Sequence, residues 1–176
     1  MKKNTTLRLV LAALFTALGI LLPMVLHPFG ISGQVFLPMH VPVLLCGLIT
    51  GSAYGALTGF IVPLLSGALT GMPSIWPVGV SMALELAAYG FFAGLLHKRF
   101  NVFISLIGAM LAGRIVMGIV NAIIFGLSGT PYGFSAFISA AFVTALPGII
   151  IQLILIPVII YALGNTDVMK RLSAHG

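Results

Sequence analysis

Long apolar runs fill this chain and are interrupted by short segments rich in Gly, Pro and Asn. Interpreted as helices, the runs predict elements at residues 5–26, 40–51, 54–69, 77–96, 102–127 and 136–163. The second and third are short: at about 1.5 Å per residue each reaches only roughly 18–24 Å, less than the ~30 Å apolar core of a bilayer. They can therefore form two short helices or one bent span across "GLITGSAYGALTG".

The composition identifies lipid as the solvent of these helices. Hydrophobic residues make up 60% of the 176 positions and charged residues 6%, whereas a soluble domain carries about 25% charged residues. The mean hydropathy is +1.23. We expect a single all-α integral membrane domain over residues 1–176. Its first apolar run is longer than the apolar part of a signal peptide, about 7–15 residues, and is therefore expected to remain as a span.

Positive charge predicts the topology. Seven of the eight basic residues lie near the ends of the chain or in "HKRFN": Lys2, Lys3, Arg8, Lys98, Arg99, Lys170 and Arg171. Six spans place all seven on one side of the membrane, whereas five spans divide them. Because basic residues gather on the cytoplasmic side, the pattern favours six spans with both termini in the cytoplasm. The pI near 10.0 then needs no nucleic acid partner.

Two charges remain inside the apolar runs, Glu85 in "SMALELAAYG" and Arg114 in "LAGRIVMGIVN". A charged group at the bilayer centre is costly unless it is paired or hydrated. Glu85 and Arg114 are almost equally far from the turn "HKRFN". An antiparallel hairpin of the fourth and fifth helices would place both about 16–18 Å from its inner end. The pair either fixes helix packing or lines a polar pocket for a ligand, and we favour the pocket.

Three of the predicted helices carry polar or small residues at spacings that place them on one face. The sets are Ser81, Glu85 and Tyr89; Arg114 and Asn121; and Thr144, Gly148 and Gln152. Any one set can satisfy a neighbouring backbone group or bind a water. Together they predict an internal polar site among the fourth, fifth and sixth helices.

Further candidates lie toward the outer side. Trp76, the only tryptophan, is either an interface anchor or an aromatic wall over a ring-containing ligand. His40 begins the second helix, where a cap or loop hydrogen bond is the alternative to ligand binding, and Gln34 lies in the preceding loop. The four histidines are divided between the two sides and Cys46 is the sole cysteine, so we expect no metal site. The outer loops, which are either short connectors or a lid, comprise residues 27–39, 70–76 and 128–135.

Two short segments raise the alternative of an enzyme. The segments "GISG" at 30–33 and "GLSG" at 126–129 fit the Gly-x-Ser-Gly pattern of rhomboid-type intramembrane proteases. A serine nucleophile needs a base, which rhomboids take from a histidine in the last helix of their core, and the predicted helix 136–163 has none. The chain has no paired aspartates for an aspartyl protease and no phosphate-binding loop, so it cannot itself hydrolyse ATP. We expect no catalytic residue and no cofactor.

The small-xxx-small pattern Ala13-x-x-x-Ala17 on the first helix permits close helix contact. Together with the short length and the six helices, it resembles the S component of energy-coupling factor (ECF) vitamin transporters. The closest-looking stretch is "FLPMHVPVLLCGLITGSAYGALTGFIVPLLSGALTGMPSIWPVGVSMALELAAYGFFAGLL". It resembles the branch that includes pantothenate-type S components, and the resemblance covers nearly the whole chain.

The resemblance implies a bundle in a bacterial cell membrane that binds one micronutrient from outside. It implies docking through Ala13 and Ala17 on a transmembrane T subunit, with two ATPase subunits powering the complex. The residues expected near the substrate are Glu85, Arg114, Asn121, Gln152, Trp76, Tyr89, His40 and Gln34.

The substrate stays open between two chemistries. Arg114 can hold a carboxylate, as pantothenate needs, and pantothenate is favoured. Glu85 can instead accept hydrogen bonds from a neutral heterocycle such as hydroxymethylpyrimidine, pyridoxine, α-ribazole or a folate-type ligand. The alternative class is a small membrane scaffold protein without a ligand.

Overall fold

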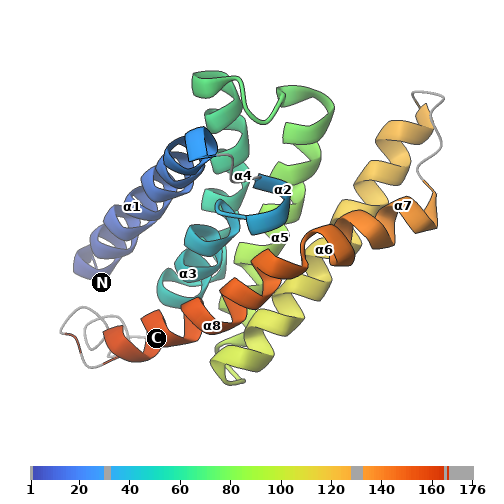
Figure 1. Ribbon diagram of the computed structural model, residues 1–176. Helices are drawn as coiled ribbons and strands as arrows, with labels where there is room; N and C mark the ends of the chain where they lie inside the picture. The colour runs from blue at the N-terminus through green and yellow to red at the C-terminus, as the bar shows by residue number, and fades with distance from the viewer. Residues whose placement is uncertain (1, 30–32, 128–132, 165, 167–176) are drawn as a thin grey trace.

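The structure is a computed structural model of the 176-residue chain that describes residues 2–29, 33–127, 133–164 and 166. In this part of the chain every regular element is a helix (Figure 1). The elements are α1 (Lys2–Leu26), η1 (His27–Phe29), α2 (Gly33–Phe36), α3 (His40–Thr50), α4 (Ser52–Thr70), η2 (Ile75–Gly79), α5 (Val80–Leu96), α6 (Val102–Leu127), α7 (Phe134–Ile138), η3 (Ser139–Thr144) and α8 (Leu146–Leu163). Six segments are long and apolar enough to cross a membrane, which confirms the predicted all-α membrane fold.

The helices α3 and α4 meet at Gly51 in a sharp reversal. Gly51 has φ +101°, a backbone conformation that side chains with a Cβ rarely adopt. The predicted pair of helices at 40–51 and 54–69 is therefore confirmed, and the alternative of one bent span is wrong. All residues of α3 are buried. Its shortness is tolerated because protein, rather than lipid, surrounds its backbone groups.

The closest helix contacts join α3, α4 and α5 through glycines. A Cβ on Gly90 of α5 would overlap the backbone of Gly55 in α4, and a Cβ on Gly47 of α3 would overlap the carbonyl of Gly90. Small residues let helix backbones approach in this way, so that van der Waals packing holds the bundle together where lipid offers no hydrophobic drive. This contact fixes α5, which also packs along α6.

The last predicted helix, 136–163, is not continuous. It divides into α7, the wide turn η3 and α8. Pro147 stands in the first turn of α8. Because proline has no backbone N–H, it cannot continue the hydrogen-bond ladder of the preceding segment, and it is well tolerated where a helix begins. The fourth helix shows a similar irregular start, since Trp76 in η2 has non-helical backbone angles and α5 begins only at Val80.

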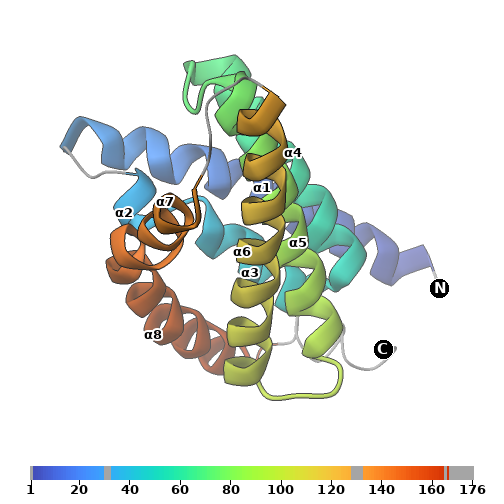
Figure 2. The same ribbon diagram turned by 90° about the vertical axis from the view of Figure 1, so that its right-hand side faces the viewer.

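The ends of the helices lie at two opposite sides of the bundle. In Figures 1 and 2 the start of α1, the α5–α6 turn and the end of α8 lie toward the lower side, and the α4–η2 connection lies toward the upper side. Figure 2 shows α6 between α8 and α5. The Arg8 side chain approaches Gly51 on the lower side, which Lys98 and Arg99 share. The cytoplasmic assignment of this side stays a prediction, and Lys170 and Arg171 lie outside the described residues.

Candidate functional site

Glu85 of α5 and Arg114 of α6 form an ion pair inside the bundle. Arg114 Nη1 donates to Glu85 Oε1 at 2.8 Å, and the two residues are only 4% and 5% exposed. The predicted pairing across an antiparallel hairpin is thus confirmed. Both charges are shielded by protein, as a charge within a membrane requires.

The turn between α5 and α6 and one glycine set this register. The side chain of Asn101 accepts a hydrogen bond from the Ile104 N–H at 2.9 Å, which begins α6 a few residues after α5 ends. Gly113 then lies against the Tyr89 ring, where a Cβ would come within 2.9 Å of it. The two helices therefore approach closely at the depth of Arg114.

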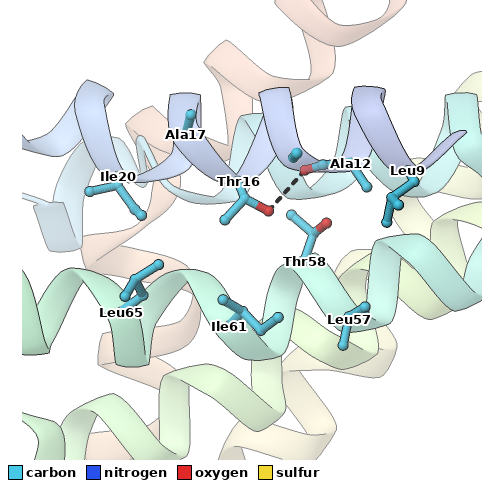
Figure 3. A pocket seen from close by; sticks show the side chains of 10 residues that line it. Leu9, Ala12, Thr16, Ala17, Ile20, Leu57, Thr58, Ile61 and Leu65 are labelled. Atoms are coloured by element: carbon cyan, nitrogen blue, oxygen red, sulfur yellow. Dashed lines mark hydrogen bonds between the residues drawn. The ribbon is translucent and has the colours of Figure 1, made fainter. Parts of the chain in front are cut away.

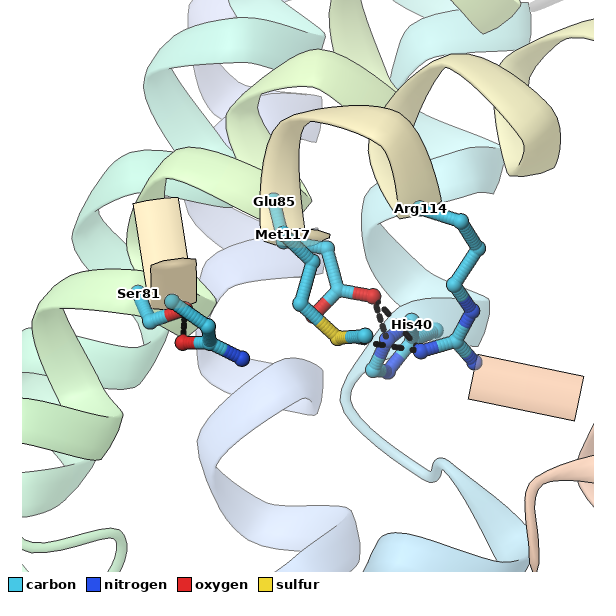
Figure 4. A network of polar contacts seen from close by, with 6 residues as sticks. His40, Ser81, Glu85, Arg114 and Met117 are labelled. Atoms are coloured by element: carbon cyan, nitrogen blue, oxygen red, sulfur yellow. Dashed lines mark hydrogen bonds and ion pairs between the residues drawn. The ribbon is translucent and has the colours of Figure 1, made fainter. Parts of the chain in front are cut away.

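Two ring side chains complete what we call the charged cluster, which consists of His40, Glu85, Tyr89 and Arg114. Figure 4 shows His40, Glu85 and Arg114 of this cluster. The Nε2 atom of His40 lies 3.7 Å from Glu85 Oε1, and its ring meets Tyr89 edge to face at 5.2 Å between centroids. The guanidinium of Arg114 lies 5.9 Å from the Tyr89 ring centroid. Three helices thus converge on one carboxylate, with a cation–π contact behind it.

Several polar atoms of this region have no hydrogen-bond partner although they are buried. They are Arg114 Nε and Nη2, both ring nitrogens of His40, and Gln152 Nε2. A buried donor without a partner costs roughly 1–3 kcal/mol. Glu85 engages Nη1, so the Nε–Nη2 edge of Arg114 remains free. That edge is the planar fork that binds a carboxylate through two parallel hydrogen bonds.

A second polar contact lies farther along the same hairpin. Ser81 Oγ donates to Asn121 Oδ1, and Asn121 is half-buried. Met117 stands between this contact and the charged cluster (Figure 4), where its sulfur lies 3.6 Å from Arg114 Nη1. Asn121 follows Arg114 by seven residues, or about 10 Å along a helix. The hairpin therefore presents charged and neutral polar groups at two depths.

Gln152 is 1% exposed on α8. It lies one turn beyond Gly148, which packs against the backbone of Val35 and Phe36. Thr144 of the same predicted stripe is half-buried and belongs to η3 rather than to α8. The inward face of α8 is thus polar at Gln152, as the spacing predicted, although the stripe crosses a helix break.

Trp76 and Gln34 are not part of the charged cluster. Trp76 is 64% exposed, and Gln34, in the short helix α2, is also exposed. Their roles in binding stay predictions. Sequence reasoning missed Met117 and Gly113, whose apolar character gives no signal of a place beside the ion pair.

An apolar groove runs between α1 and α4 (Figure 3). Its volume is about 400 Å³, and we call it the α1–α4 groove. It is lined by Leu9, Ala12, Ala13, Thr16, Ala17, Ile20, Leu57, Thr58, Ile61 and Leu65. Ala13 and Ala17 are exposed, and only 17% of the apolar window of α1 is buried, against 78% for the α2–α3 segment. The first helix therefore leaves a face of small residues open.

These features define a class, a small six-span membrane protein with a buried and incompletely paired polar site. Residues 7–160 match the family model of the ECF transporter, substrate-specific component. The match covers most of the chain, so the chain belongs to this family of substrate-specific membrane subunits. No curated protein and no solved structure matches it.

Proposed function

We propose that this chain binds a water-soluble vitamin that carries a carboxylate, with pantothenate favoured, and hands it to a T subunit driven by two ATPase subunits. The observation that carries the proposal is the unpartnered Nε–Nη2 edge of Arg114. Membership of the substrate-specific family supports the transport role, and the arginine supports the class of substrate.

The free edge favours a carboxylate over a neutral ring. Glu85 already balances the charge of Arg114, but it uses only one of the three guanidinium nitrogens. A carboxylate would satisfy both remaining donors at once with charge-assisted bonds. On this assignment Glu85 holds Arg114 in position, and Arg114 makes the contact with the ligand.

The contact between Ser81 and Asn121 can bind the hydroxyl end of pantothenate, opposite its carboxylate. Pantothenate carries its carboxylate at one end and hydroxyl groups at the other. Ser81 and Asn121 lie about 10 Å along the hairpin from Arg114, and their side chains can exchange hydrogen bonds with hydroxyl groups. Gln152 Nε2, buried and unpartnered, is a further donor that we assign to the ligand.

For docking, we propose that the α1–α4 groove with Ala13 and Ala17 receives the T subunit. Exposed small residues on α1 permit a partner helix to approach closely. The groove is lined by α1 and α4 and the charged cluster by α3, α5 and α6, so docking and ligand binding use separate faces.

The test is identification of the ligand. The protein is purified mildly and analysed by native mass spectrometry, and binding of radiolabelled pantothenate is compared with that of pyridoxine and hydroxymethylpyrimidine. We expect bound pantothenate or another carboxylate vitamin. Binding of a neutral heterocycle alone would overturn the carboxylate assignment, and absence of binding by every vitamin would support a scaffold without a ligand.

A further inference from the structure

The charges of the cluster sum to zero only when no ligand is bound. With Glu85 and Arg114 ionised and His40 neutral, the net charge is zero. A bound carboxylate would bring the buried site to a net charge of minus one. Burying an uncompensated charge is costly, and a nearby group usually changes its protonation state instead. Both Glu85 and His40 can take up a proton, and His40 is the group whose ring nitrogens are buried without hydrogen-bond partners.

We propose that the carboxylate ligand is bound together with one proton, which His40 takes up from solvent. The inference rests on the proposed function and deepens it by naming the residue that selects an anion. The proton would reside on Nε2, which lies 3.7 Å from Glu85 Oε1. A small movement turns this approach into an N–H···O bond, so Glu85 lies between two cations while Arg114 turns its free edge to the ligand.

The side chains around His40 offer no other group that could gain a positive charge when the carboxylate binds. The elements packed against α3 are α1, α4, α5 and α8, with weaker contacts elsewhere. Outside the charged cluster, the described titratable side chains of these four elements are Arg8, Tyr54 and Tyr161, and α3 itself adds Cys46. Arg8 lies against Gly51 at the far end of α3, and Tyr161 is in the last turn of α8. A tyrosine or a thiol cannot supply a positive charge.

The sign of the effect follows from linkage. If binding takes up a proton, affinity rises as the pH falls, over the window between the proton affinities of His40 in the free and the bound states. The dissociation constant then increases up to about tenfold per pH unit within that window. An unperturbed histidine titrates near pH 6.5, while a carboxylate ligand stays ionised there.

The experiment is calorimetry of the full chain with pantothenate in buffers of different ionisation enthalpy. We expect uptake of about one proton per ligand within the window, and a dissociation constant that rises with pH. Panthenol, in which an alcohol replaces the carboxylate, should bind without proton uptake. A dissociation constant for pantothenate independent of pH, or equal proton uptake with panthenol, overturns the inference.

Three variants locate the proton. His40→Gln should abolish proton uptake and weaken pantothenate binding. Glu85→Gln removes the negative charge, so a bound carboxylate alone balances Arg114. Affinity should fall because Arg114 loses its ionic partner, and whatever ligand still binds should take up no proton. His97→Gln, in the α5–α6 turn, is the matched control and should keep full uptake. Uptake that persists in His40→Gln assigns the proton elsewhere and overturns the assignment.

Thermal unfolding checks that each variant folds, and the measurements on the unaltered chain stand if a variant does not. Failure of every vitamin to bind refutes the proposed function together with this inference. Pantothenate binding without proton uptake refutes the inference alone.

Discussion

Glu85 and Arg114 in the charged cluster are 4% and 5% exposed, whereas Ala13 and Ala17 in the α1–α4 groove face outward. The cluster holds ionised groups at a depth where lipid cannot solvate them, and it leaves donors unpaired. The groove has almost no polar surface to satisfy, and its shape comes from small side chains. On the proposed function the buried cluster recognises the ligand by charge and the exposed groove receives the partner by close contact, so one bundle of 176 residues would separate the two tasks.

The largest effect of a single substitution is expected at Arg114. Arg114→Gln should reduce carboxylate affinity at least about 100-fold, because it removes the ligand's fork and leaves Glu85 buried without a partner. Equilibrium binding of radiolabelled pantothenate measures the loss. Arg114→Lys keeps the charge but lacks the planar edge, so it should also bind weakly while folding normally. The control is Arg99→Gln in the exposed turn; wild-type affinity in Arg114→Gln would remove Arg114 from the site.

The groove should respond in the opposite way. Ala13→Trp or Ala17→Trp fills the space that a partner helix needs, so we expect loss of the complex with the T subunit and unchanged vitamin binding. Affinity purification with co-expressed T and ATPase subunits measures the first, and ligand binding the second. Leu14→Trp, at an exposed position of α1 outside the groove lining, is the control. Intact complex with both bulky substitutions would refute the docking assignment.

The glycine contact supports both regions, since α5 carries Glu85 and Tyr89 of the cluster and packs on α4. Gly90→Ala puts a methyl group into the backbone of Gly55, and overpacking of this kind costs about 1–3 kcal/mol. A lowered thermal unfolding midpoint is expected in detergent. Gly126→Ala is the matched control, because its Cβ would meet no atom within 4 Å. Equal midpoints for both variants would contradict the packing account.

The smallest effect is expected at Trp76. Because its side chain is 64% exposed, Trp76→Ala should weaken ligand binding only about threefold, the size of a peripheral contact. A binding titration beside Arg114→Gln gives the comparison. A loss of more than about tenfold would extend the site from the charged cluster to the loop before α5, as the aromatic-wall interpretation predicts.

The class of protein, the six spans and the central ion pair could all be predicted from the sequence. Long apolar runs with few charges are compatible with few structures other than membrane-spanning helices. Glu85 and Arg114 lie at nearly equal distances on either side of the "HKRFN" loop, which predicts their pairing. The spacing of Gln152 on α8 likewise predicts its inward face, because helical periodicity is local.

The remaining features follow from the three-dimensional fold. It separated α3 from α4 at Gly51, broke the last helix at η3, and left Trp76 and Gln34 outside the cluster. It also brought His40 from a distant helix to within 3.7 Å of Glu85 and left the Nε–Nη2 edge of Arg114 free. These outcomes depend on how backbones approach at glycines such as Gly90 and Gly113, and no spacing along one helix encodes such contacts between helices.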